Sequence, residues 1–155
     1  MEVLVYIAIL AIMLVVITNA TISIVSSARV VKVSKSIGTS AIISLERITR
    51  EVRGASSVST SSSVLDSNPG KLVLSSFDSS GNPRTIEFSL STSTIRMKEN
   101  NIDVGALSQG DARITYLVFH NFTGTSSGIR IDTTIESGTS TYYRSAYFNT
   151  SAVLR

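Results

Sequence analysis

The sequence predicts an α+β fold in which a long N-terminal α-helix packs by its second half on an antiparallel β-sheet. Three observations predict it: an apolar run over residues 1–28, apolar residues at helical spacing over 37–55, and alternation of apolar and polar residues from 71 onward. An antiparallel sheet of this kind has one face to cover, and an amphipathic helix offers a matching stripe. The apolar first half of the helix should therefore protrude.

The N-terminal apolar run is long enough to cross a membrane. A spanning helix needs about 20 apolar residues, and the run from Val3 to Ile24 meets that length. Its length, and the lack of a basic residue before it, differ from a secretory signal peptide, so we expect a retained helix. The membrane-helix positions that we single out are Val3, Leu4, Val5, Ile7, Ile9, Leu10, Ile12, Leu14, Val15 and Ile17.

The helix should continue beyond the apolar run to about Arg53. Glu46 and Arg50 are four residues apart with the acid first, which favours a helical ion pair, and Gly54 follows as a helix end. We therefore divide the chain into a transmembrane or assembly helix, 1–28, and an extracytoplasmic part, 29–155. The residues expected to pack on the sheet recur at spacings of three and four: Ile37, Ala41, Leu45, Ile48 and Val52.

The remainder is predicted to form one sheet of four to six strands. A serine-rich segment, 55–63, is expected to be a linker or loop. Residues 71–77 and 84–91 alternate on either side of a turn cluster and should form a hairpin. The other expectations are a short strand at Ile95 and Met97, a loose region at 99–111, a central strand at 113–122, and strands at 129–135 and 142–147, the last extended by 148–155.

Composition argues against most enzyme chemistry. The chain has no cysteine and one histidine, His120, which we expect to be structural. It has none of the common sequence motifs of hydrolases, metalloproteases, nucleotide-binding loops or dinucleotide-binding turns. We therefore predict no catalytic residue, no metal site and no cofactor.

Charge is concentrated on the helix. Residues 1–56 contain six basic and three acidic residues, whereas the rest has eight of each and is neutral. This basic excess predicts contact with lipid headgroups or with acidic side chains of a neighbour. A nucleic-acid partner is unsupported, because no aromatic residues interleave with the basic ones.

Glu2 is the only ionisable side chain in residues 1–28. A carboxylate in hydrocarbon costs roughly 2.5 kcal/mol or more, and such residues usually have a partner and a function. The identity of that partner is the central functional question.

The motifs around Glu2 resemble those of type IV pilin-like proteins, most closely the minor pilins and the J-type pseudopilins of type II secretion. The resemblance rests on four segments. The first is the glutamate and the apolar helix that follows it. The segments are Glu2–Leu10, Leu45–Arg53, Val118–Phe122 and Phe148–Arg155.

This resemblance implies a role for Glu2. In pilin filaments the corresponding glutamate neutralises the free N-terminal amine of the neighbouring subunit, and two opposite charges buried together are tolerable where either alone is not. The implied partners are other pilin or pseudopilin subunits, bound through the N-terminal helix, and the inner membrane. The family's glutamate is the fifth mature residue after a cleaved basic leader, and many major pilins also have a helix proline near Asn19.

Here only Met1 precedes Glu2, and no proline is near Asn19. The absent proline favours a minor subunit. Either the chain starts inside a longer one, with prepilin peptidase as a partner if an upstream leader exists, or it is not processed as a prepilin. The positive-inside rule would hold Arg29, Lys32 and Lys35 in the cytoplasm, whereas the family pattern places the sheet outside.

Two functional hypotheses follow from these observations. The first is a structural minor subunit of a type IV pilus or type II secretion filament, held in the inner membrane before assembly. The alternative is a signal-anchored, extracytoplasmic, β-rich binding module for adhesion or DNA uptake.

Overall fold

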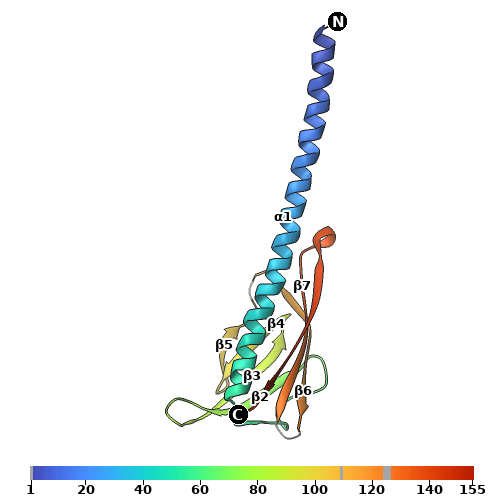
Figure 1. The fold of residues 1–155 in the computed structure, drawn as a ribbon. Helices are drawn as coiled ribbons and strands as arrows, with labels where there is room; N and C mark the ends of the chain where they lie inside the picture. Colours follow the sequence, from blue (N-terminus) through green and yellow to red (C-terminus); the bar gives the residue numbers. More distant parts are fainter. Residues whose placement is uncertain (1, 109, 124–126) are drawn as a thin grey trace.

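The computed structural model describes residues 2–108, 110–123 and 127–155. One helix, α1 (Glu2–Gly54), runs for 53 residues. Figure 1 shows it as a nearly straight rod whose first half stands clear of the strands and whose second half lies alongside them. The α+β prediction, with one long helix packed on antiparallel sheet, is confirmed.

The strands form two antiparallel sheets rather than the single sheet expected from the sequence. In each sheet the strands are neighbours in chain order. The five-stranded sheet contains β1 (Ser57–Val58), β2 (Lys71–Phe77), β3 (Pro83–Ser91), β4 (Thr94–Glu99) and β5 (Ile102–Ala106); the three-stranded sheet contains β6 (Arg113–Phe122), β7 (Gly128–Ser137) and β8 (Arg144–Val153).

The hairpin predicted for 71–77 and 84–91 is confirmed as β2 and β3, which pair from Lys71 with Ser89 to Phe77 with Pro83. The short strand at Ile95 and Met97 is β4. The last strand and its expected extension form the single strand β8. A one-turn helix, η1 (Ser140–Tyr142), lies between β7 and β8.

The prediction that the strand 113–122 is central was wrong. The strand 113–122 is β6, an edge strand, and β7 is the central strand of its sheet. The segment 64–70 covers the free edge of β6, because the Asp66 N–H donates to Phe119 O at 2.9 Å and the Gly70 N–H to Leu117 O at 2.8 Å. This cover explains why an edge strand is so apolar, and it protects the edge from pairing with other chains.

The region 99–111, expected to be loose, contains β5. This strand has no buried apolar face, since Ile102 and Val104 are 72% and 57% exposed. It is held by backbone pairing with β4 and by an ion pair between Asp103 and Arg96. Neither contact requires apolar and polar residues to alternate, which is the pattern by which strands are recognised in a sequence. The serine-rich segment likewise contains a two-residue strand, β1.

Both sheets and the second half of α1 share one hydrophobic core. Helix α1 contacts β7 and β8 most extensively and β2 more lightly. Ile37, Ala41, Ile48 and Val52 are buried in this core, and Leu45 is partly buried against it. None of residues 2–36 is buried. We refer to residues 2–36 as the projecting half of α1 and to residues 37–54 as the packed half.

Candidate functional site

The projecting half carries the candidate assembly surface. Its Glu2–Ile24 part is apolar on every side, as expected of a helix surrounded by lipid or by other helices. It is the one helix in the described chain that is long and apolar enough to span a membrane. Each of the following residues exposes at least 52% of its surface: Val3, Leu4, Val5, Ile7, Ile9, Leu10, Ile12, Leu14, Val15 and Ile17.

The two threonine hydroxyls in this part of the helix are satisfied within it. The Thr18 hydroxyl donates to Leu14 O at 2.8 Å, and the Thr21 hydroxyl donates to Ile17 O at 2.9 Å. Such bonds leave neither threonine hydroxyl unsatisfied in hydrocarbon, where each unsatisfied polar group costs several kcal/mol. The threonines are therefore compatible with a membrane-embedded or tightly packed helix.

Glu2 is exposed in the first turn of α1. The free N–H groups of that turn favour a nearby negative charge, but only by about 0.3–1 kcal/mol. The first basic residue along the chain is Arg29, about 40 Å away at a rise of about 1.5 Å per residue. Within the described chain, Glu2 thus has no cation with which to pair.

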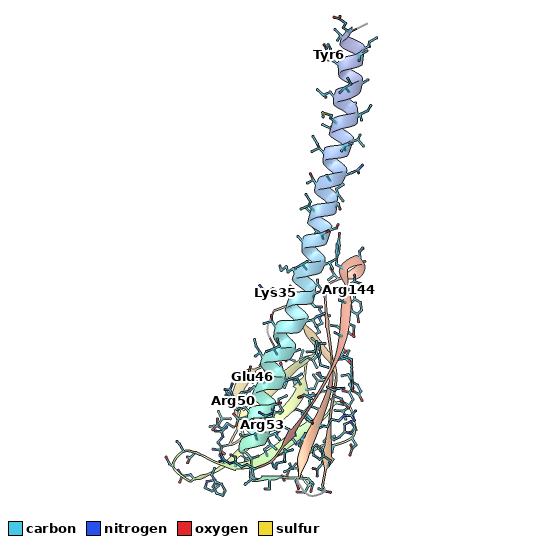
Figure 2. The ribbon with its side chains drawn as sticks, in the orientation of Figure 1. Tyr6, Lys35, Glu46, Arg50, Arg53 and Arg144 are labelled. Carbon is cyan, nitrogen blue, oxygen red and sulfur yellow. The ribbon has the colours of Figure 1, made fainter. Side chains whose placement is uncertain are left out.

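The packed half is fixed to the sheets by charge as well as by apolar contacts. Glu51 pairs with Arg47 on the same helix at 2.9 Å and with Arg84 on β3 at 2.6 Å. Arg84 also lies 3.2 Å from Glu99 on β4. Glu46 and Arg50 form the expected helical pair at 3.0 Å, but on the exposed face of the helix. Figure 2 labels both of these residues, together with Arg53 farther along the helix.

His120 lies in a separate polar cluster on the three-stranded sheet. Its Nδ1 contacts Asp66, and its Nε2 lies 3.1 Å from Asp132. Asp132 is buried and accepts hydrogen bonds from Arg130 Nε at 3.1 Å and Nη2 at 2.8 Å. The bonds from Arg130, followed by a bond from Tyr147, hold the pKa of Asp132 below its ordinary value.

This cluster is suited to tying the loop 64–70 to β6 and β7. Both nitrogens of the His120 ring already face carboxylates, so neither is free to activate a nucleophile. Among the described residues, no three His, Asp or Glu side chains are grouped so as to hold a metal ion. The sequence did not reveal this cluster, because Asp66 is 54 residues away from His120.

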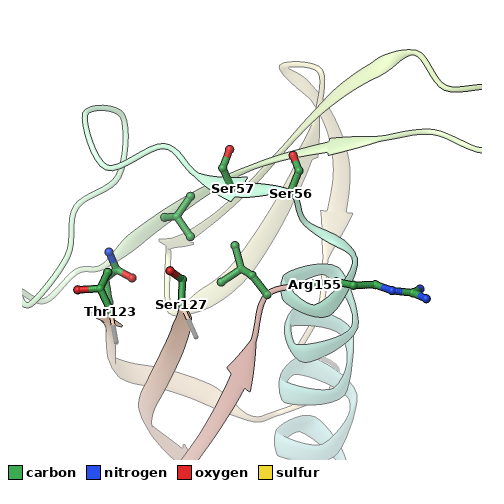
Figure 3. A pocket seen from close by; sticks show the side chains of 8 residues that line it. Ser56, Ser57, Thr123, Ser127 and Arg155 are labelled. Carbon is green, nitrogen blue, oxygen red and sulfur yellow. The ribbon is translucent and has the colours of Figure 1, made fainter. Parts of the chain in front are cut away.

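Two of the clefts of the folded domain lie at its opposite ends. One is a groove of about 540 Å³ near the C-terminus, lined mainly by hydroxyl and amide side chains; Arg155, which borders it, reaches away from the serines and threonine in Figure 3. The other, of about 390 Å³, lies between the projecting half of α1 and the turn from β7 to β8. The groove residues include Ser56, Ser57, Asn121, Thr123 and Ser127.

Comparison with known proteins gives no relative: no family model matches the chain, and no curated protein and no solved structure matches it.

Proposed function

We propose that this protein is a structural minor subunit of a filament of the type IV pilin class, either a pilus or a type II secretion pseudopilus. Before assembly it would be held in the inner membrane by the projecting half of α1, with the sheet domain extracytoplasmic. In the filament the apolar helices would pack together and the sheets would face outward.

A single observation carries this proposal: the lone carboxylate of Glu2 begins an exposed apolar helix and has no cation near it in the described chain. A buried carboxylate without a partner is strongly destabilising, and a partner amine compensates for it. The terminal amine of a second copy could supply that partner, because it would lie within one turn of Glu2 along an adjacent, axially staggered helix. Other subunits of the same class could supply it equally well.

The test replaces Glu2 and follows two readouts separately. We expect Glu2→Ala and the isosteric Glu2→Gln to insert in the membrane as the natural chain does, but to be absent from sheared filaments. Thr18→Ala is the matched control, since Thr18 lies on the same helix and its hydroxyl bonds only within it. Normal filament incorporation of Glu2→Gln would overturn the proposal.

Processing provides an independent test of the same assignment. Mass spectrometry of the protein from its native membranes should find an N-terminus three residues upstream of Met1, with a methylated amine. That start would place Glu2 at the fifth mature position. An unprocessed N-terminus at Met1 would instead favour the second candidate function.

The second candidate is an anchored, extracytoplasmic binding module for adhesion or DNA uptake. The hydroxyl-lined groove in Figure 3 favours it, because it lies at the end of the domain opposite the projecting helix, where a surface ligand has access. Its Ser, Thr and Asn side chains include both donors and acceptors. Tight ligand binding that survives Glu2→Gln and is lost in Ser57→Val with Asn121→Leu would support this function.

A further inference from the structure

Unpaired positive charges gather at the end of the domain from which the projecting half of α1 emerges. We call this region the stem end and define it as residues 29–36, 110–113 and 137–144. Figure 2 shows Lys35 and Arg144 at the same level along the helix axis. Five basic side chains of the stem end have no carboxylate within ion-pair distance among the described residues: Arg29, Lys32, Lys35, Arg113 and Arg144.

The acidic groups of this region do not balance those charges. Asp111 lines the same cleft as Arg29 and Lys32. Glu136, which adjoins the region, accepts a hydrogen bond from the Thr115 hydroxyl at 3.1 Å, and its bond with Tyr143 raises the pKa of that phenol. Five cations against these two carboxylates leave three positive charges. In the packed half, by contrast, two of the three arginines, Arg47 and Arg50, have carboxylate partners.

The cleft of the stem end is formed by close packing of a turn on the helix. Gly138 adopts φ +92°, and a Cβ there would lie 2.5 Å from Tyr142 O and 3.2 Å from Val33 Cγ2. A side chain at this position would collide with the backbone of Tyr142 and crowd Val33, so glycine lets the turn close on itself beside α1. As a result the Arg29 guanidinium lies over the Tyr142 ring, 5.5 Å from its centroid. Lys32, Ser36 and Thr139 line the same cleft of about 390 Å³.

The membrane-proximal edge of this cleft, at Arg29, matches the height of the headgroup layer of a membrane. The 22 residues Val3–Ile24 extend about 33 Å as a helix, slightly more than a hydrocarbon core of about 30 Å. Arg29 is five residues farther, about 7.5 Å beyond the hydrocarbon boundary, and each headgroup layer is roughly 5–8 Å thick. Tyr142, which contacts Arg29, lies at the level where tyrosines are enriched in membrane proteins.

We propose that the stem end is a binding site for anionic phospholipid headgroups, with a lipid phosphate held between Arg29 and Lys32 beside Tyr142. The inference rests on the proposed membrane insertion of α1 and adds a lipid class to it. Arginine supplies a planar fork of donors that suits phosphate, and lysine adds a point charge. Docking of this kind would fix the height and rotation of the domain on the membrane before assembly.

The absence of cysteine from the sequence allows a site-specific probe. The full chain carrying Thr139→Cys, labelled with an environment-sensitive fluorophore, is placed in nanodiscs of phosphatidylcholine with or without phosphatidylglycerol. We expect the emission to shift to the blue only with phosphatidylglycerol, and the shift to shrink at high salt. Amide hydrogen exchange of residues 138–143 in the unlabelled chain should slow under the same conditions, which controls for disturbance by the label.

Two double variants that remove the same charge test which part of the protein produces the response to phosphatidylglycerol. Arg29→Gln with Lys32→Gln should abolish the blue shift and the slower exchange. Arg50→Gln with Arg53→Gln removes the same charge from the other end of α1 and should preserve both. Equal responses in the two lipids, or equal losses in the two double variants, would overturn the proposal. A shift produced by inorganic phosphate with phosphatidylcholine alone would also overturn it in favour of a free-anion site.

Two further outcomes separate this inference from the proposed function. A shift that appears only when several chains share one nanodisc would assign the cations to the acidic surface of a neighbour and overturn lipid docking. Extraction of the chain from membranes by alkaline carbonate would show that α1 does not insert, and would overturn the membrane part of the proposed function as well as this inference. Stable insertion without lipid selectivity overturns this inference alone.

Discussion

The two halves of α1 belong to one unbroken helix but obtain their stability from different surroundings. The packed half buries Ile48 and Val52 completely and is paired through Glu51 with a neighbouring strand. No residue of the projecting half is fully buried within the chain, and the hydroxyls of Thr18 and Thr21 bond back to its own carbonyls. One helix is thus a core element at one end and an exposed apolar surface at the other.

The largest expected effect comes from truncating the same kind of side chain in each half. Ile48→Ala leaves a cavity in a fully buried site, and we expect it to lower the free energy of unfolding by about 2–4 kcal/mol. Leu14→Ala removes a side chain that is 63% exposed and should change it by less than about 0.5 kcal/mol. Denaturant unfolding in mild detergent measures both. Similar losses would mean that the projecting half is part of the folded core.

A second comparison concerns a partly buried and an exposed ion pair of the packed half. Arg84→Ala removes a partly buried partner of Glu51 and should cost about 1–2 kcal/mol, because that carboxylate then stays only 12% exposed with less compensation. Arg50→Ala breaks an exposed pair and should cost at most about 0.5 kcal/mol. The same unfolding assay applies, with a double-mutant cycle through Glu51→Gln. Equal costs would show that Arg84 does not fix the helix to β3.

Acid should weaken the sheet domain before it affects the projecting half. Arg130 holds the pKa of Asp132 below its ordinary value of 3.8, so ionised Asp132 stabilises the fold above that pH. The contribution is lost as the pH falls through the depressed value in the folded state. We expect Asp132→Asn to flatten the pH dependence of urea unfolding in this window, while the helicity of residues 2–28 in detergent stays constant. An unchanged acid transition in that variant would contradict the assignment.

The smallest expected effect is a gain of stability where the halves meet. Gly38 has helical backbone, and a Cβ there would meet no atom within 4 Å. Gly38→Ala should therefore stabilise α1 by at most about 1 kcal/mol. Gly70→Ala is the opposite control, since its Cβ would lie 2.8 Å from Leu117 O and should destabilise the protein. A loss of stability in Gly38→Ala would reveal a constraint on the helix at this junction.

Local patterns made much of the fold predictable. Alternation located the β2–β3 hairpin, and helical spacing of Ile37 and Ile48 located the face that the sheets cover. The division into two sheets was not predictable, because alternation does not state which strands are neighbours. Strand β5 was missed because its apolar residues face outward, and β6 was placed centrally because the segment 64–70 covers an edge in the way that a strand would.

The candidate site likewise has one feature that the sequence reveals and one that it does not. Glu2 stands out in the sequence because a carboxylate is exceptional in an apolar helix. The cleft of the stem end does not, since Arg29 and Tyr142 are joined only when the turn after β7 folds back on α1. A positive φ at Gly138 is a local feature that prepares this contact, and a glycine in a turn is too common to reveal it.

Because α1 is unbroken through residues 29–36, it fixes how the sheets are rotated about the helix axis relative to Glu2. No hinge separates the two halves, so the azimuth of the sheets is fixed by the number of residues between Glu2 and Ile37. Each added residue would turn the domain by about 100° and raise it by about 1.5 Å. The length of the helix between Glu2 and the sheets therefore fixes the direction in which β5 and the groove near the C-terminus face, relative to Glu2.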